Sequence, residues 1–159
     1  MENDIKVSVA LLSYKHANYI RKCLDSILEQ EVDFRYEIVV GEDCSNDGTK
    51  EILLEYQEKH PDIFVLLLNE QNMGASRNAL NVSSHLRGQY VCSCESDDFW
   101  LDTHQMQKQA DFLDAHPEFA LVSTEMVMFD RDGDWGKTRV IERPQVDDFC
   151  THAPFFCHA

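Results

Sequence analysis

A chain of 159 residues, 43% of them apolar, is long enough to bury one sizeable core and too short for two ordinary domains. Its formal net charge of −15 repels the phosphates of DNA, RNA and anionic membranes, which excludes a polyanion-binding protein unless a local cationic site or a metal reverses that sign. We therefore expect one domain and no nucleic-acid partner.

The apolar stretches are short. The longest, such as Val7 to Leu12 and Phe64 to Leu68, are far below the roughly 20 residues that a transmembrane helix needs. The chain begins Met-Glu-Asn-Asp, with acids where a secretory signal carries Lys or Arg. Its six cysteines contain no CxxC pair and are expected to be buried free thiols. These features predict a cytoplasmic protein without a transmembrane segment, and leave open a peripheral place at the inner membrane face for the full-length protein.

The first 60 residues alternate apolar runs with amphipathic segments. A strand is predicted over Val7 to Tyr14, and the segment Asn18 to Gln30 places one apolar stripe on a helix, formed by Ile20, Leu24, Ile27 and Leu28. The pattern then repeats. Tyr36 to Val40 predicts a second strand, and a helix follows the turn at 43–48 and stops before Pro61.

The same alternation continues after Pro61. Phe64 to Leu68 predicts a third strand, and Ser76 to Leu86 predicts a helix that Gly88 is expected to terminate in a left-handed conformation. Tyr90 to Cys94 predicts a fourth strand, and a helix is expected from His104 to Ala115. An apolar run over 119–129 and a turn at 130–136 follow.

Alternating strands and helices predict an α/β fold: a Rossmann-like, open and mostly parallel sheet with helices on both faces. We expect a single domain over 1–159 with its core at about 5–130. Residues 131–159 are polar and end near an aromatic pair, Phe155-Phe156, so we interpret them as the start of an incomplete segment, truncated at the C-terminus. Ligands of such sheets bind at the carboxyl edge.

Polar side chains follow three of the predicted strands, and we expect all of them to face one cleft. They are Ser13-Tyr14, Glu42-Asp43 and Glu95-Ser96-Asp97-Asp98. A ring that can stack, a lone carboxylate that can accept an N–H and a carboxylate cluster that can hold a divalent cation together suit a nucleoside diphosphate derivative. Mg²⁺ or Mn²⁺ would reverse the repulsion between diphosphate and carboxylates and stabilise the charge on the leaving group.

Each of these features also has a plainer explanation. An acidic triplet after a strand is commonly a capped turn, and Tyr14 alone fits a core or rim aromatic. Arg77, at the start of a helix after a Gly-containing loop, is as compatible with a surface salt bridge as with a phosphate contact. Their conjunction at three strand ends favours a nucleotide site.

These residues resemble the family 2 glycosyltransferases from about Val7 to Phe129. The resemblance is carried, in order and spacing, by Val7 to Tyr14, Cys23 to Gln30, Glu37 to Thr49, Asn72 to Asn78 and Gly88 to Trp100. It implies a GT-A fold and metal-dependent transfer of a sugar from a nucleoside-diphosphate sugar, with a UDP-sugar favoured. The acceptor would be a hydroxyl of a glycan, lipid-linked or polysaccharide acceptor, in glycan or polysaccharide biosynthesis.

The resemblance also implies individual roles. Asp43 should accept the uracil imide N–H, with Tyr14 or its neighbours against the base, and Asp97 should bond the ribose or bridge to the cation. Asp98 is the implied metal ligand, with Glu95 or Asp97 as the alternative. The nucleotide-sugar-binding residues that we predict are Ser13, Tyr14, Glu42, Asp43, Arg77 and Asp97.

The sequence departs from the family pattern in four places. Leu12 stands where the family often has Pro, Lys15 where it often has Asn, and Glu42 and Glu95 where Asp is commoner. Glu keeps the charge of Asp but reaches further, so we expect a metal geometry that differs from the common family pattern. An inverting transfer also needs a general base, which the family carries in its later, acceptor-side segment. By the resemblance, residues 131–159 would begin that segment, and we expect the base beyond residue 159.

Other classes fit less well. A sugar-phosphate nucleotidyltransferase needs a Gly-rich loop after the first strand, where residues 13–17 contain no glycine. A receiver domain needs an acid pair there, whereas this strand ends in Tyr14. The alternative that remains is a catalytically silent nucleotide-binding or protein-interaction module, which would bind a nucleotide weakly, without metal dependence or turnover.

Overall fold

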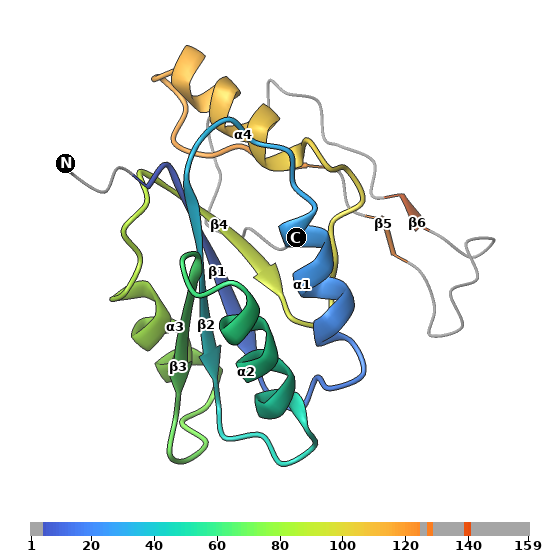
Figure 1. The fold of residues 1–159 in the computed structure, drawn as a ribbon. Coiled ribbons are helices and arrows are strands. Elements are labelled where there is room, and N and C mark those ends of the chain that lie inside the picture. Colours follow the sequence, from blue (N-terminus) through green and yellow to red (C-terminus); the bar gives the residue numbers. More distant parts are fainter. Residues whose placement is uncertain (1–4, 125–126, 129–138, 141–159) are drawn as a thin grey trace.

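The computed structural model describes residues 5–124, 127–128 and 139–140, which confirm the predicted open α/β sheet (Figure 1). The elements in chain order are β1 (Val7–Ser13), α1 (Ile20–Leu28), β2 (Tyr36–Glu42), α2 (Thr49–Lys59), β3 (Phe64–Leu68), α3 (Ala75–Ser83), β4 (Tyr90–Glu95), α4 (Gln105–Ala115), β5 (Val127–Met128) and β6 (Arg139–Val140). Within the predicted apolar run, residues 119–124 form neither helix nor strand, and 127–128 lie in β5. The rest of that run and the turn at 130–136 lie outside the described residues.

The main sheet has the order β3-β2-β1-β4, and all three of its pairings are parallel. The register brings the strand ends level, because Ser13 lies opposite Glu42 and Leu12 lies opposite Glu95. The segments that follow β1, β2 and β4 therefore leave the sheet at one edge. β5 and β6 pair with each other as an antiparallel ladder.

The helices cover both faces of this sheet. Figure 1 shows α1 and α2 on one face, while α3 contacts β1 and β2 from the other. Right-handed crossovers dictate this, because the chain runs from β1 to β3 in one direction and then returns across the sheet to β4. Helix α1 buries one stripe completely, with Ile20, Leu24 and Ile27 each 0% exposed. In the described part of the chain, no helix is both long enough and apolar enough to cross a membrane.

Gly41 in β2 permits α3 to lie close against the sheet. An ideal Cβ at Gly41 would stand 2.4 Å from Oδ1 of Asn78 and 2.6 Å from Cγ2 of Val82. The Asn78 side-chain amide donates a hydrogen bond of 2.7 Å to the Gly41 carbonyl. Any side chain at position 41 must therefore displace α3 or the side chains of Asn78 and Val82.

We expect Gly41→Ala to lower the free energy of unfolding by about 1 to 2 kcal/mol, because it overpacks a buried contact. Urea unfolding measures this loss. In a Val82→Ala background, which removes one of the two overlapping groups, the cost of Gly41→Ala should fall. The same cost in both backgrounds would contradict overlap with Val82 as its cause.

The prediction that Gly88 ends α3 in a left-handed conformation is wrong. The helix ends at Ser83, and the positive φ angles among the described residues belong to Lys15, Cys44, Gly48 and Gly74. Gly88 is needed for close packing instead, since an ideal Cβ there would stand 2.4 Å from the backbone nitrogen of Ser8. Its N–H donates a 2.7 Å hydrogen bond to the Ser8 hydroxyl.

The four cysteines in the described residues are free thiols, and the prediction that they are buried holds for two of them. Cys23 and Cys94 are buried with their sulfur atoms 3.8 Å apart, Cys92 is half-buried and Cys44 is exposed. Contact with Cys23 and burial raise the pKa of the Cys94 thiol, which keeps it protonated. The remaining two, Cys150 and Cys157, lie outside the described residues.

Candidate functional site

A hollow of about 400 Å³ opens at the carboxyl edge of the sheet, between the ends of β1, β2 and β4 and the start of α3. Its lining residues are Leu12, Ser13, Tyr14, His16, Asp43, Asn72, Gly74, Ala75, Asn78 and Glu95. Four of the residues singled out in the sequence are thus brought together: Ser13, Tyr14, Asp43 and Glu95. This is the edge at which open parallel sheets bind their ligands.

The carboxylate of Asp43 is held firmly at the wall of this hollow. It is 3% exposed, and its Oδ1 accepts the Met73 backbone N–H at 2.8 Å and the Asn69 side-chain N–H at 3.0 Å. Its Oδ2 accepts the Gly74 N–H, at the start of α3, at 2.9 Å. An ionised carboxylate has about four acceptor positions. Three are used by the protein, so Oδ2 keeps capacity for one further donor.

A network of asparagine side chains supports Asp43. Asn69 donates to Asn78 Oδ1 at 3.0 Å as well as to Asp43, and Asn81 donates to Asn69 Oδ1 at 3.2 Å. Asn78, 2% exposed, anchors the network to the Gly41 carbonyl of β2. Sequence reasoning missed this support. The available signal was the recurrence of Asn at 69, 72, 78 and 81, after the third strand.

Ser13 and Tyr14 contribute an unpaired hydroxyl and an exposed ring. Ser13 is 2% exposed, and its Oγ has no hydrogen-bond partner among the described residues. A buried polar group without a partner costs about 1 to 3 kcal/mol, so a ligand atom that bonds Ser13 would recover that cost. The ring of Tyr14 is 40% exposed, with the Lys15 ammonium 5.1 Å from its centroid. Such a ring is accessible to a stacked base.

The acidic loop, residues 95–98, reaches the hollow through Glu95. Glu95 is half-buried and lines it, whereas Asp97 and Asp98 are exposed and do not. The described residues contain no group of three His, Cys, Asp or Glu side chains placed to hold a metal ion. Mg²⁺ sites commonly use only one or two carboxylates and complete their coordination with substrate phosphates. The carboxylate oxygens of Glu95, with those of Asp97 and Asp98 in the same loop, are donors of the kind that Mg²⁺ and Mn²⁺ bind.

Two other predicted residues do not line the hollow. Glu42 is 1% exposed, and its Oε1 accepts the Ser45 N–H at 2.8 Å, which holds the loop after β2. Arg77 lies exposed on α3. Of the predicted strand-end residues, Ser13, Tyr14, Asp43 and Glu95 therefore line this hollow, whereas Glu42, Ser96, Asp97 and Asp98 are not among its lining residues.

The loops after β1 and β2 are joined by backbone-to-side-chain hydrogen bonds. Lys15 donates to Ser45 Oγ at 2.9 Å, His16 to Thr49 Oγ1 at 3.0 Å and Ala17 to Asp47 Oδ2 at 3.1 Å. Burial opposes the charge on Asp47, but hydrogen bonds from Thr49 and Ala17 outweigh it and lower its pKa. One wall of the hollow is thereby fixed without any ligand.

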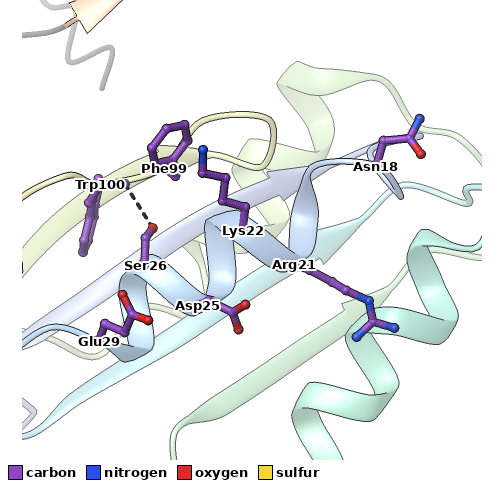
Figure 2. Close-up of a pocket in the computed structure, with 8 residues that line it drawn as sticks. All are labelled: Asn18, Arg21, Lys22, Asp25, Ser26, Glu29, Phe99 and Trp100. Atoms are coloured by element: carbon purple, nitrogen blue, oxygen red, sulfur yellow. Dashed lines mark hydrogen bonds between the residues drawn. The ribbon is translucent and has the colours of Figure 1, made fainter. Parts of the chain in front are cut away.

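A second hollow, of about 510 Å³, lies along the outer side of α1 (Figure 2). It is lined by Asn18, Arg21, Lys22, Asp25, Ser26, Glu29, Phe99 and Trp100. Its polar groups already serve the fold, since Arg21 pairs with Glu55 at 2.8 Å and Asp25 accepts the Tyr56 hydroxyl at 2.6 Å. Figure 2 also shows the hydrogen bond, 3.0 Å long, that the backbone N–H of Trp100 donates to Ser26 Oγ. No strand end opens into this hollow, so we place the candidate site at the carboxyl edge.

Residues 8–158 match the family described as glycosyl transferase family 2. A putative glycosyltransferase of Bacillus subtilis, EpsE, is 28% identical over 158 residues, which cover 99% of this chain and 56% of that protein. The uncharacterized Mycobacterium tuberculosis protein Rv1520 is 38% identical over 112 residues, 70% of this chain and 32% of its own length. The chain therefore spans between a third and just over half of these relatives.

Solved structures share the fold. TarS 1–349 of Staphylococcus aureus in complex with UDP superposes with a TM-score of 0.63 at 29% identity, over 71% of this chain and 33% of that one. The mannosyltransferase PcManGT of Pyrobaculum calidifontis, in complex with GDP-Man and Mn²⁺, gives a TM-score of 0.61 at 25% identity, over 85% of this chain and 38% of that one. Both neighbours confirm the predicted GT-A architecture for the described sheet and helices.

Proposed function

Because this chain belongs to glycosyl transferase family 2, we propose that its carboxyl-edge hollow binds the nucleoside diphosphate of a nucleotide-sugar donor. The observation that carries the proposal is Asp43, a buried carboxylate fixed by three N–H groups, with one acceptor position left on Oδ2. The unpartnered hydroxyl of Ser13 in the same hollow supplies a second polar contact. Tyr14, exposed at the rim, offers its ring to the base.

The proposed donor is a UDP-sugar. The uracil imide N–H matches the single free position of Asp43, and the related TarS was solved with UDP and with UDP-GlcNAc. A guanine base also presents N–H donors, and the related PcManGT was solved with GDP-Man. Competition between UDP and GDP distinguishes the two, and tighter binding of GDP would replace the uridine assignment while leaving the nucleotide site in place.

The proposed cation is Mg²⁺ or Mn²⁺, held by Asp98 and Glu95, with Asp97 on the ribose or bridging to the cation. Bound there, the cation would neutralise the diphosphate and stabilise negative charge on it as the sugar departs. The residues of this chain bind and orient the donor. Asp43 fixes the base, Ser13 bonds a polar atom of the donor, and Glu95 supplies the negative charge that would attract the cation to the diphosphate side of the hollow.

The reaction that we propose is transfer of the sugar to an acceptor hydroxyl, with inversion, during glycan or polysaccharide biosynthesis at the cytoplasmic side of a membrane. The acceptor is proposed to be a glycan, lipid-linked or polysaccharide chain. Inversion needs a general base on the acceptor side. We propose that this base lies beyond residue 159, because the chain covers only part of the length of its relatives. Arg77, exposed on α3, is kept as a candidate contact for a donor phosphate.

Titration of UDP into the protein by calorimetry, with and without Mn²⁺, tests this function. Mn²⁺ is expected to tighten UDP binding at least about tenfold, or roughly 1.4 kcal/mol, because it removes the repulsion between diphosphate and carboxylates. Glu95→Ala and Asp98→Ala are expected to abolish that gain. Asp111→Ala, on the exposed side of α4, is the matched control and should change nothing. UDP binding that is weak and indifferent to Mn²⁺ would favour the silent nucleotide-binding module instead.

A further inference from the structure

We propose that His16 is a positioning residue that ties the acidic loop to the carboxyl end of β1 and so sets the distance between the base-binding and diphosphate-binding halves of the hollow. The inference rests on the proposed function, since it gives His16 a part in donor binding. His16 follows β1 and lines the hollow, and it contacts all three strand-end loops.

The backbone of His16 fixes its place beside the second loop. Its N–H donates to Thr49 Oγ1 at 3.0 Å, and its carbonyl accepts the N–H groups of Tyr19 and Ile20 at 2.9 Å each. The preceding residue, Lys15, has a φ of 60°. This left-handed conformation is unusual for a residue with a side chain, and it is maintained by the surrounding hydrogen bonds. The imidazole is therefore presented from a rigid turn.

The side chain of His16 reaches the acidic loop 80 residues further along the chain. Its Nδ1 makes a short hydrogen bond with the hydroxyl of Ser96, a side chain that is 0% exposed. Its Nε2 lies 4.0 Å from Oδ2 of Asp97. One ring nitrogen of His16 thus bonds Ser96 while the other faces the Asp97 carboxylate.

Ser96 is well placed to pass this constraint to its neighbours, because it lies between Glu95 and Asp97. On the other side of the loop, the Cys23 thiol donates to the Glu95 carbonyl at 3.5 Å. The bond between His16 and Ser96 is a side-chain hydrogen bond that joins this loop to the β1 end. Without it, Asp97 and Asp98 would lose their fixed distance from Asp43 and Tyr14, while Glu95, which the sheet pairs opposite Leu12, and the Asp43 network would stay in place.

The bond between His16 and Ser96 should therefore affect metal-dependent binding of UDP and leave metal-independent binding unchanged. The test measures UDP affinity by calorimetry with and without Mn²⁺. His16→Ala and Ser96→Ala are each expected to reduce the Mn²⁺-dependent gain in UDP affinity about five- to tenfold, the effect of losing one buried hydrogen bond. The affinity for UDP without metal is expected to stay within about twofold. The double variant should lose no more than either single variant, because both remove the same bond.

Two further variants separate positioning from general stability. His16→Asn keeps an amide near the position of Nδ1 and is expected to restore most of the Mn²⁺-dependent gain. His85→Ala removes an exposed histidine just after α3, whose ring contacts the nearby Ser84 and Asn81, and should leave both affinities unchanged. Equal losses with and without Mn²⁺, or additive losses in the double variant, would overturn the inference. An unmodified protein that binds no UDP in either condition would refute the proposed function as well.

Discussion

Asp43→Asn is expected to weaken UDP binding roughly 100-fold, or about 2.7 kcal/mol. The substitution keeps the shape of the side chain but replaces one acceptor oxygen with an N–H₂ group. The remaining oxygen is best placed at Oδ1, where two donors converge from Met73 and Asn69. The amide nitrogen then occupies the Oδ2 position and faces the Gly74 N–H and the ligand N–H, donor against donor.

Calorimetry in the presence of Mn²⁺ measures this loss, and a modified nucleotide identifies its cause. UDP methylated at the uracil N3 lacks the imide N–H, so the unmodified protein should bind it much more weakly than UDP. The Asp43→Asn protein should bind both nucleotides equally weakly. Asp111→Asn, an exposed substitution of the same type on α4, is the control for the loss of charge alone. Equal affinity of the unmodified protein for both nucleotides would remove Asp43 from the base site.

The same substitution also tests the structural part of Asp43. The carboxylate satisfies two backbone N–H groups before and at the start of α3, and a buried donor left without an acceptor costs about 1 to 3 kcal/mol. The binding measurements must therefore be made well below the midpoint of thermal unfolding of the variant, so that lost affinity is separated from lost fold.

The sheet was predictable because its strands are apolar and separated by amphipathic helices, and because crossover connections leave few topologies. The residues at which the helices end were harder to predict. The predicted helix over Ser76 to Leu86 ends at Ser83, and Gly88 serves close packing against Ser8 instead of a left-handed turn. That contact joins residues 80 positions apart, and no local pattern reveals it.

The candidate site also has a part that the sequence predicts and a part that it does not. Ser13, Asp43 and Glu95 converge because level parallel strands bring their ends to one edge, a consequence of the register. The pleat of β2 and the turn after it decide which of the adjacent acids Glu42 and Asp43 faces the hollow. Asp43 faces it, whereas Glu42 accepts the Ser45 N–H within the loop after β2. The partnership of His16 with Ser96 depends on tertiary packing, so the sequence placed Ser96 in the acidic segment without a role of its own and did not predict His16 as part of the site.

At the opposite edge of the sheet, Glu37 in β2 carries a buried charge that the fold must neutralise. It is 1% exposed, and its Oε1 accepts the Ser8 hydroxyl at 2.6 Å, on the neighbouring strand, and the Arg87 backbone N–H at 2.8 Å. Its Oε2 accepts the guanidinium Nε of Arg87 at 2.8 Å. Burial opposes ionisation of Glu37, but the bonds from Arg87 and Ser8 outweigh it and lower its pKa.

Arg87→Met is therefore expected to lower the free energy of unfolding by about 2 to 3 kcal/mol at neutral pH, because it leaves the buried Glu37 charge without its counter-ion. Methionine retains an apolar stem, so the loss reports mainly the charge. Urea unfolding measures it. Arg21→Met, which breaks the exposed pair with Glu55, is the matched control and should cost less than about 1 kcal/mol.

The cost of Arg87→Met should also depend on pH, and the sign follows from the lowered pKa of Glu37. A carboxylate with a lowered folded-state pKa stabilises the fold above its unfolded-state pKa, and that contribution is lost as pH falls through the folded-state value. In the variant, burial dominates and favours the protonated acid. The difference in stability between the unmodified protein and Arg87→Met should therefore shrink from pH 7 to about pH 4.5, near the ordinary pKa of Glu. A difference that is constant over this range would show that Arg87 acts through packing and not through the Glu37 charge.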